Sequence, residues 1–148
     1  MTTSQRNPQD VIAPNVQPSP ASRAMMWTGY VLSGLAILAL SLDAGGKLLF
    51  PSTMIANTPP TGLPADIDFY RVLGSILAAS VALYAWPRTS FLGAILLTGY
   101  LGGAVATNLR VSMPLFTFTL VGVYLGLLVW GGLWLRDARL RALFPWRD

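Results

Sequence analysis

The stretch that most constrains this chain is FLGAILLTGYLGGAVATNLR, Phe91–Arg110, which carries no charged residue before its last position. A helix needs roughly 20 mainly apolar residues to cross a bilayer, and this stretch is long enough. Its glycines would weaken a helix in water, since each costs about 1 kcal/mol relative to Ala. In lipid, small residues instead allow helices to approach closely. We therefore predict a transmembrane helix, with Gly99 and Gly103 one turn apart on a face that packs against other helices of the chain.

Three further apolar runs have a similar length and character. Charged residues make up only 11% of the chain, against about 25% in ordinary soluble domains. We predict an all-α fold, an integral membrane four-helix bundle over residues 24–145. The four spans are expected at residues 25–43, 68–86, 91–109 and 115–135. The segment 1–23, rich in Pro, Gln, Asn and Ser, is expected to be a disordered cytoplasmic tail, and residues 146–148 a short C-terminal tail.

The connections between the spans differ in length and indicate the topology. Pro87–Ser90 and Val111–Pro114 are so short that the spans they join must be antiparallel neighbours. Pro51–Asp66 is longer and rich in proline, so we expect an irregular segment that folds over the mouth of the bundle. In the fourth span Gly122 and Gly126 repeat the four-residue spacing, and we assign them to helix packing as well. A homodimer face is the alternative for these glycine pairs.

The distribution of arginine and lysine predicts the orientation of the bundle. With four spans, both termini and the second connection lie on one side of the membrane. That side carries seven basic residues, Arg6, Arg23, Arg88, Arg136, Arg139, Arg141 and Arg147, and the opposite side carries Lys47, Arg71 and Arg110. The positive-inside rule therefore places both termini in the cytoplasm, and we expect a multi-pass protein of a bacterial inner membrane. The net charge of +4 then reflects orientation and does not indicate nucleic-acid binding.

The chain contains no cysteine and no histidine. This composition excludes a disulfide framework, a thiolate metal site and a haem attachment motif. It also removes the side chain best suited to proton transfer near neutral pH. The sequence shows no catalytic triad, phosphate-binding loop or metal-ligand cluster. We therefore assign no catalytic or metal-binding residue and expect no independent catalysis.

Five polar side chains are expected to gather at the non-cytoplasmic mouth of the bundle: Asp43, Lys47, Arg71, Asn108 and Arg110. Ionisable groups close to hydrocarbon are costly and often mark a site. One interpretation is a pocket for an anionic or quinone-like head group. The other is that these residues are interfacial anchors that extend to water and pair with each other. Asp43 and Lys47, four residues apart, would pair on a continuous helix, although Gly45 and Gly46 weaken that helix.

Four tyrosines lie within or near the spans: Tyr30, Tyr84, Tyr100 and Tyr124. Such residues usually pack in the interior or lie at the membrane interface, and we expect the same here. The alternative is that a tyrosine hydroxyl donates a hydrogen bond to a bound quinone.

Two long segments indicate a family. LGAILLTGYLGGAVATNLRV (Leu92–Val111) with the following MPLF, and VYLGLLVWGGLWLRDARLRALFP (Val123–Pro145), resemble the DoxX-like family of small four-helix membrane proteins. The similarity extends over about residues 27–145. The family takes its name from a subunit of a thiosulfate:quinone oxidoreductase. The resemblance therefore implies a quinone as the candidate cofactor and a redox protein as a candidate partner.

The chain departs from its relatives at three positions. Family members commonly carry histidine where this chain has Asn108 and Phe118, and often an acidic residue near the position of Leu77. All three residues here are non-ionisable, so any proton or metal chemistry that relatives perform with them is lost. The departures thus favour an accessory role over catalysis.

Three functions follow from these observations. The first is an accessory or quinone-associated subunit of a membrane redox system. The second is a small-solute transporter or permeability factor, which would require a homo-oligomer because four spans hardly form a pathway alone. The third is a structural or assembly protein of the membrane. In each case the lipid bilayer is the surrounding partner.

Overall fold

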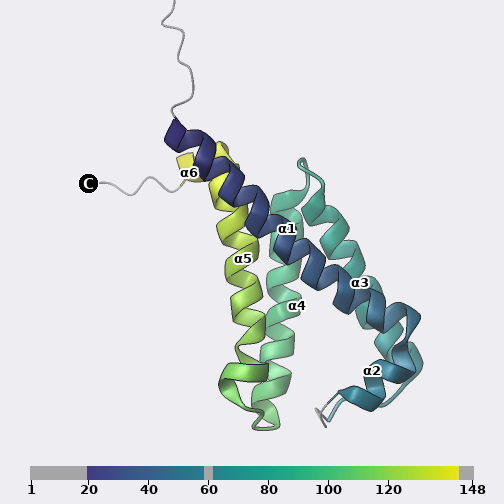
Figure 1. The fold of residues 1–148 in the computed structure, drawn as a ribbon. Helices are drawn as coiled ribbons and strands as arrows, with labels where there is room; N and C mark the ends of the chain where they lie inside the picture. Colours follow the sequence, from purple (N-terminus) through teal and green to yellow (C-terminus); the bar gives the residue numbers. More distant parts are fainter. Residues whose placement is uncertain (1–19, 59–61, 144–148) are drawn as a thin grey trace, which may run out of the picture.

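The computed structural model describes residues 20–58 and 62–143, and these form helices without any strand. Three long helices are α1 (Pro20–Leu49), α3 (Ile67–Ala85) and α4 (Ser90–Arg110). The fourth consists of a π-helical turn, η2 (Leu115–Thr119), and α5 (Val121–Arg136). Each of the four is long and apolar enough to cross a membrane, which confirms the predicted all-α fold with four membrane helices (Figure 1).

The four long helices form a ring in the order α1, α3, α4, α5. Helix α1 contacts α3 and α5, and α4 also contacts α3 and α5, whereas α1 and α4 lie across the bundle from each other. Figure 1 shows that α1 crosses α5 near its own start and then runs obliquely toward α3. The backbones of α1 and α4 therefore stay apart at the other end of the bundle.

Glycines bring the helix backbones together at each of the four contacts of this ring. A Cβ atom at Gly132 of α5 would lie 2.8 Å from the backbone nitrogen of Ser33 in α1, and one at Gly74 of α3 would lie 2.9 Å from Cβ of Lys47. At the turn between α3 and α4, a Cβ on Gly93 would lie 2.2 Å from the Tyr84 nitrogen. Gly122 of α5 is similarly close to α4. Such close approach is how helices associate in lipid.

The glycines predicted to pack behave differently from one another. Gly122 lies against α4, where a Cβ would meet Val105 Cγ2 at 2.7 Å. No atom lies within 4 Å of a Cβ built on Gly99, Gly103 or Gly126. The expectation that Gly99 and Gly103 pack against another helix of the chain is therefore not met, because the helix opposite them, α1, has diverged. A homodimer face at Gly126 stays a prediction.

A buried polar contact fixes the crossing of three helices. The Tyr84 side chain of α3 is fully buried, and its hydroxyl donates to the Val129 carbonyl of α5 over 2.8 Å. Because this uses its only proton, the Ser33 hydroxyl of α1 donates to the Tyr84 oxygen over 3.0 Å. The Arg136 guanidinium stands 4.9 Å from the Tyr84 ring centroid. These bonds satisfy hydroxyls that would otherwise be costly to bury.

Several element boundaries differ from the sequence prediction. Helix α1 begins at Pro20, so residues 20–23 are helical and not part of a disordered tail, and it continues through Gly45 and Gly46 to Leu49. Residues 1–19 and 144–148, including both outer tails, lie outside the described residues. The connection expected to be irregular contains a short helix, α2 (Pro51–Asn57), which contacts α1 and α3. A last helix, α6 (Ala138–Leu143), follows α5.

Candidate functional site

A cavity of about 850 Å³ lies between α1 and α4 at the end of the bundle where α1 and α5 have diverged. Its walls come from α1, α3, α4 and α5, together with Met54 of α2 and Phe118 of η2. Gly99 and Gly103 line it from α4, and no atom lies within 4 Å of a Cβ built at either position. The missing side chains on this face of α4 therefore create much of the space. The size of the cavity is typical of sites for small organic ligands.

The wall of the cavity is mainly apolar, and an ion pair from α1 provides its charged part. The Lys47 ammonium donates to the Asp43 carboxylate one helical turn earlier, as the four-residue spacing predicted. Only 14% of the Lys47 side chain is exposed, against 38% for Asp43. The Lys47 nitrogen also stands 5.9 Å from the ring centroid of Tyr100, on α4. The pair thus bridges the space between the two helices that otherwise stay apart.

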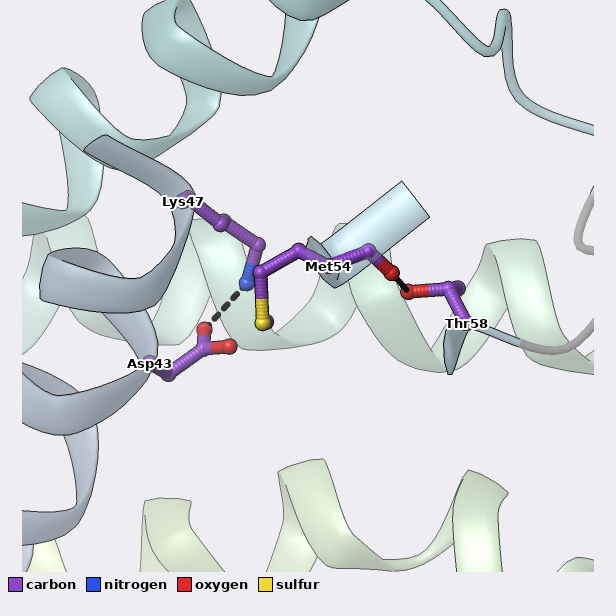
Figure 2. Close-up of polar contacts among 4 residues, drawn as sticks. All are labelled: Asp43, Lys47, Met54 and Thr58. Atoms are coloured by element: carbon purple, nitrogen blue, oxygen red, sulfur yellow. Dashed lines mark hydrogen bonds and ion pairs between the residues drawn. The ribbon is translucent and has the colours of Figure 1, made fainter. Parts of the chain in front are cut away.

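Helix α2 covers this charged part. Figure 2 shows the Met54 side chain beside the Asp43–Lys47 pair. The Met54 thioether also rests on α1, because a Cβ at Gly46 would lie 3.0 Å from its sulfur. Thr58 ends the helix by donating its hydroxyl to the Met54 carbonyl over 2.6 Å. The short helix therefore shields one side of the ion pair with an adaptable apolar side chain.

The π-helical turn shapes the opposite wall. Its backbone bonds reach five residues back, as in the bond from the Thr119 nitrogen to the Pro114 carbonyl at 3.3 Å. The Asn108 side chain donates to the Phe118 carbonyl over 3.1 Å and so ties α4 to this turn. Single π turns inside α-helical segments are often found at functional sites. Asn108 and Phe118 are therefore direct neighbours here.

The structure separates the five predicted site residues into two groups. Asp43, Lys47 and Asn108 line the cavity. Arg71 does not line it: its side chain is 57% exposed and lies 3.8 Å from the carboxylate of Asp68. Arg110 donates to the Gly62 carbonyl over 3.4 Å and is also absent from the lining. The two arginines therefore lie outside the cavity lining, and their role as interfacial anchors stays a prediction.

Several lining residues were not assigned to the site from the sequence, among them Tyr100, Gly99 and Met54. Tyr100 was expected to pack, Gly99 was assigned to a helix contact, and Met54 lay in a segment expected to be irregular. A signal was present on α4, because Tyr100 and Asn108 are eight residues apart with small residues between them. Two polar side chains at that spacing share one helix face. That face is the one turned toward the cavity.

The deep end of the cavity is closed by the core. Leu40 and Leu101 line it and are almost fully buried, and Ala36, Leu97 and Leu133 lie beyond them with no exposed surface. One copy of the chain therefore has no continuous path through this cavity to the other end of the bundle. The described residues also contain no cluster of three His, Cys, Asp or Glu that could hold a metal ion.

Four membrane helices around a one-ended, mainly apolar cavity with an ion pair in its wall define a multi-pass helical membrane protein with a ligand-sized site. The chain belongs to the DoxX-like family, whose family model matches residues 31–132. The match runs from Val31 in α1 to Gly132 in α5, and so includes every residue that lines the cavity. Searches of curated proteins and of solved structures found no match.

Proposed function

We propose that the cavity binds a neutral, lipid-soluble ligand of the quinone class. In this proposal the protein is an accessory, quinone-associated subunit of a membrane redox system and leaves catalysis to a partner redox protein. The observation that carries the proposal is the cavity, which combines a mainly apolar wall with a few polar groups from facing helices. This is the pattern of sites that hold an apolar molecule by its polar end.

The charges around the cavity favour a neutral head group over an anionic one. Lys47 is the one cation among the lining residues, and Asp43 neutralises it. An anion would have to displace the Asp43 carboxylate and leave it without its partner next to hydrocarbon, which is costly. Arg71 and Arg110 do not line the cavity and so do not add positive charge there. A quinone carbonyl requires only hydrogen-bond donors and no counter-charge.

The direction in which the cavity faces follows from the positive-inside rule. We propose that both termini lie in the cytoplasm of a bacterial cell and that the bundle spans the inner membrane. The cavity, at the end of the bundle opposite Arg88 and Arg136, would then open near the non-cytoplasmic surface. A partner that exchanges electrons with the bound quinone would dock on that side.

Two glycines of α4 allow a matched test. Gly103 lines the cavity and Gly102 does not, yet a Cβ at either position meets no atom within 4 Å. Gly103→Leu should therefore fill part of the cavity, whereas Gly102→Leu adds the same side chain elsewhere on the helix. Each protein would be purified in lipid nanodiscs and titrated with tritiated decylubiquinone. Solvent extraction with absorbance detection would measure the quinone that is retained from the cell.

We expect the wild-type protein and Gly102→Leu to bind the quinone and Gly103→Leu to bind it at least about tenfold more weakly. One excluded methylene costs about 0.8 kcal/mol, and a displaced ring excludes several. A wild-type protein that neither retains nor binds quinone would contradict the proposed function. Equal binding by the three proteins would show that the ligand sits elsewhere.

A further inference from the structure

Two tyrosines near the middle of the bundle differ in how their hydroxyls are used. The Tyr84 hydroxyl is fully buried and has a partner for both its proton and its oxygen, Val129 and Ser33. Tyr100 lines the cavity from α4, and among the described residues its hydroxyl makes no hydrogen bond. No buried polar side-chain atom of the described residues lacks a partner, so the Tyr100 hydroxyl is accessible from the cavity. The Tyr100 hydroxyl can therefore form a hydrogen bond with a molecule in the cavity.

Apart from Tyr70, each of the other polar side chains that line the cavity makes a hydrogen bond within the protein. Lys47 donates to Asp43, and Asn108 donates to the Phe118 carbonyl. The hydroxyls of the three lining threonines donate to backbone carbonyls, as Thr58 to Met54, Thr107 to Gly103 and Thr119 to Met113. Tyr70 also lines the cavity and its hydroxyl makes no hydrogen bond among the described residues, but it is only 6% exposed, so it presents less surface to a ligand than the partly exposed Tyr100.

We propose that Tyr100 is the residue that recognises the head group, by donating its hydroxyl proton to a carbonyl oxygen of the ligand. This assignment rests on the proposed function. The Lys47 ammonium, 5.9 Å from the Tyr100 ring centroid, holds the ring at the charged part of the cavity through a cation–π contact. Gly99 and Gly103 line the same cavity from α4, and a Cβ built at either position meets no atom within 4 Å. A planar head group can therefore reach the hydroxyl without displacing a side chain of α4.

The ligand class follows from this donor. A hydroxyl that donates, with no unpaired charge beside it, selects a neutral acceptor such as a quinone carbonyl over a hydrocarbon of the same size. Losing one neutral hydrogen bond corresponds to about a 2- to 12-fold change in affinity. Loss of the hydroxyl should lower the affinity for the carbonyl ligand alone, because the apolar wall makes the same contacts with both molecules.

The test uses Tyr100→Phe, which removes the hydroxyl and keeps the ring. Two control variants are Tyr124→Phe, at an exposed position of α5 outside the lining, and Tyr70→Phe inside it. Proteins in nanodiscs would be titrated with tritiated decylubiquinone and, separately, with tritiated decylbenzene, which has a ring and tail but no carbonyl. The infrared carbonyl band of the bound quinone would be recorded in parallel.

We expect Tyr100→Phe to weaken quinone binding 2- to 12-fold, to leave decylbenzene binding unchanged and to shift one carbonyl band to higher frequency. The unchanged decylbenzene binding also shows that the variant is folded. Three results would overturn the assignment of Tyr100 alone. They are equal quinone affinity in Tyr100→Phe and wild type, an equal loss of affinity for both ligands in Tyr100→Phe, and a loss of quinone affinity in Tyr70→Phe only. Failure of the wild-type protein to bind the quinone would overturn the proposed function, and the assignment with it.

Discussion

Replacing Gly93 with alanine should force α3 and α4 apart, and the structure indicates the distance. The added Cβ would lie 2.2 Å from the nitrogen and 2.5 Å from the Cα of Tyr84. Both are backbone atoms of a helix, so no side-chain rotation relieves the contact. Restoring an ordinary contact of 3.4 Å requires a separation of 1.2 Å (3.4 − 2.2). The short turn after α3 leaves little chain to absorb this shift.

The displacement would reach the polar contact at the helix crossing. If α3 takes the shift, the 2.8 Å bond from the Tyr84 hydroxyl to Val129 can lengthen to 4.0 Å (2.8 + 1.2), beyond hydrogen-bond distance. Overpacking costs about 1–3 kcal/mol, and each hydrogen bond lost adds about 1 kcal/mol. The gain in helix propensity from Gly to Ala offsets about 1 kcal/mol. We therefore expect Gly93→Ala to lower the free energy of unfolding by about 1–4 kcal/mol.

Gly99→Ala provides the matched control on the same helix. It carries the same propensity gain, and its Cβ meets no atom within 4 Å. The free energy of unfolding of both variants would be measured by titration with sodium dodecyl sulfate in mixed micelles. We expect Gly99→Ala to be at least as stable as the wild-type protein. If Gly93→Ala unfolds at the same detergent fraction as Gly99→Ala, the contact does not hold the helices together and the reasoning is wrong.

Two further predictions use the same unfolding assay. Lys47→Met leaves the Asp43 carboxylate unpaired next to hydrocarbon; breaking a fully buried pair costs about 3–5 kcal/mol, and because the Asp43 side chain is 38% exposed, we expect a loss of about 2–4 kcal/mol. Arg71→Met removes an exposed pair and should cost less than about 1 kcal/mol; equal losses would contradict the burial argument. Tyr84→Phe should cost about 1–2 kcal/mol, since it leaves a buried hydroxyl and carbonyl with fewer partners, and Tyr124→Phe should leave stability unchanged.

Much of the fold could be predicted because length and polarity alone decide which segments cross a bilayer. The short connections fixed the antiparallel order, and the four-residue spacing of Asp43 and Lys47 predicted their ion pair. Helix α2 was missed for a physical reason. A helix of seven residues has too little propensity to form alone, and it exists here because it contacts α1 and α3. Such tertiary support leaves no periodic pattern in the sequence.

The faces of the helices were harder to predict than the helices themselves. Residues that share an end of the bundle could be assigned from the topology, but their rotation about the helix axis depends on how neighbouring helices cross. Arg71 was therefore grouped with Asp43 and Lys47, although its helix turns it toward Asp68 and the surface. For the same reason Gly99 was assigned to a helix contact and not to the cavity wall, because a glycine spacing indicates a shared helix face but not what lies opposite that face.

The glycines of α4 show how one helix can serve both packing and binding. At Gly93 an added methyl group would strike the backbone of α3, so that glycine is required by the fold. At Gly99 and Gly103 an added Cβ would meet no atom within 4 Å, so a larger side chain could extend into the cavity and gain contacts with its wall. Packing alone would thus favour larger residues at these two positions, since each added contact contributes dispersion energy. Gly103→Leu should then raise the free energy of unfolding while it weakens quinone binding, the opposition between stability and function expected of a residue in a binding site.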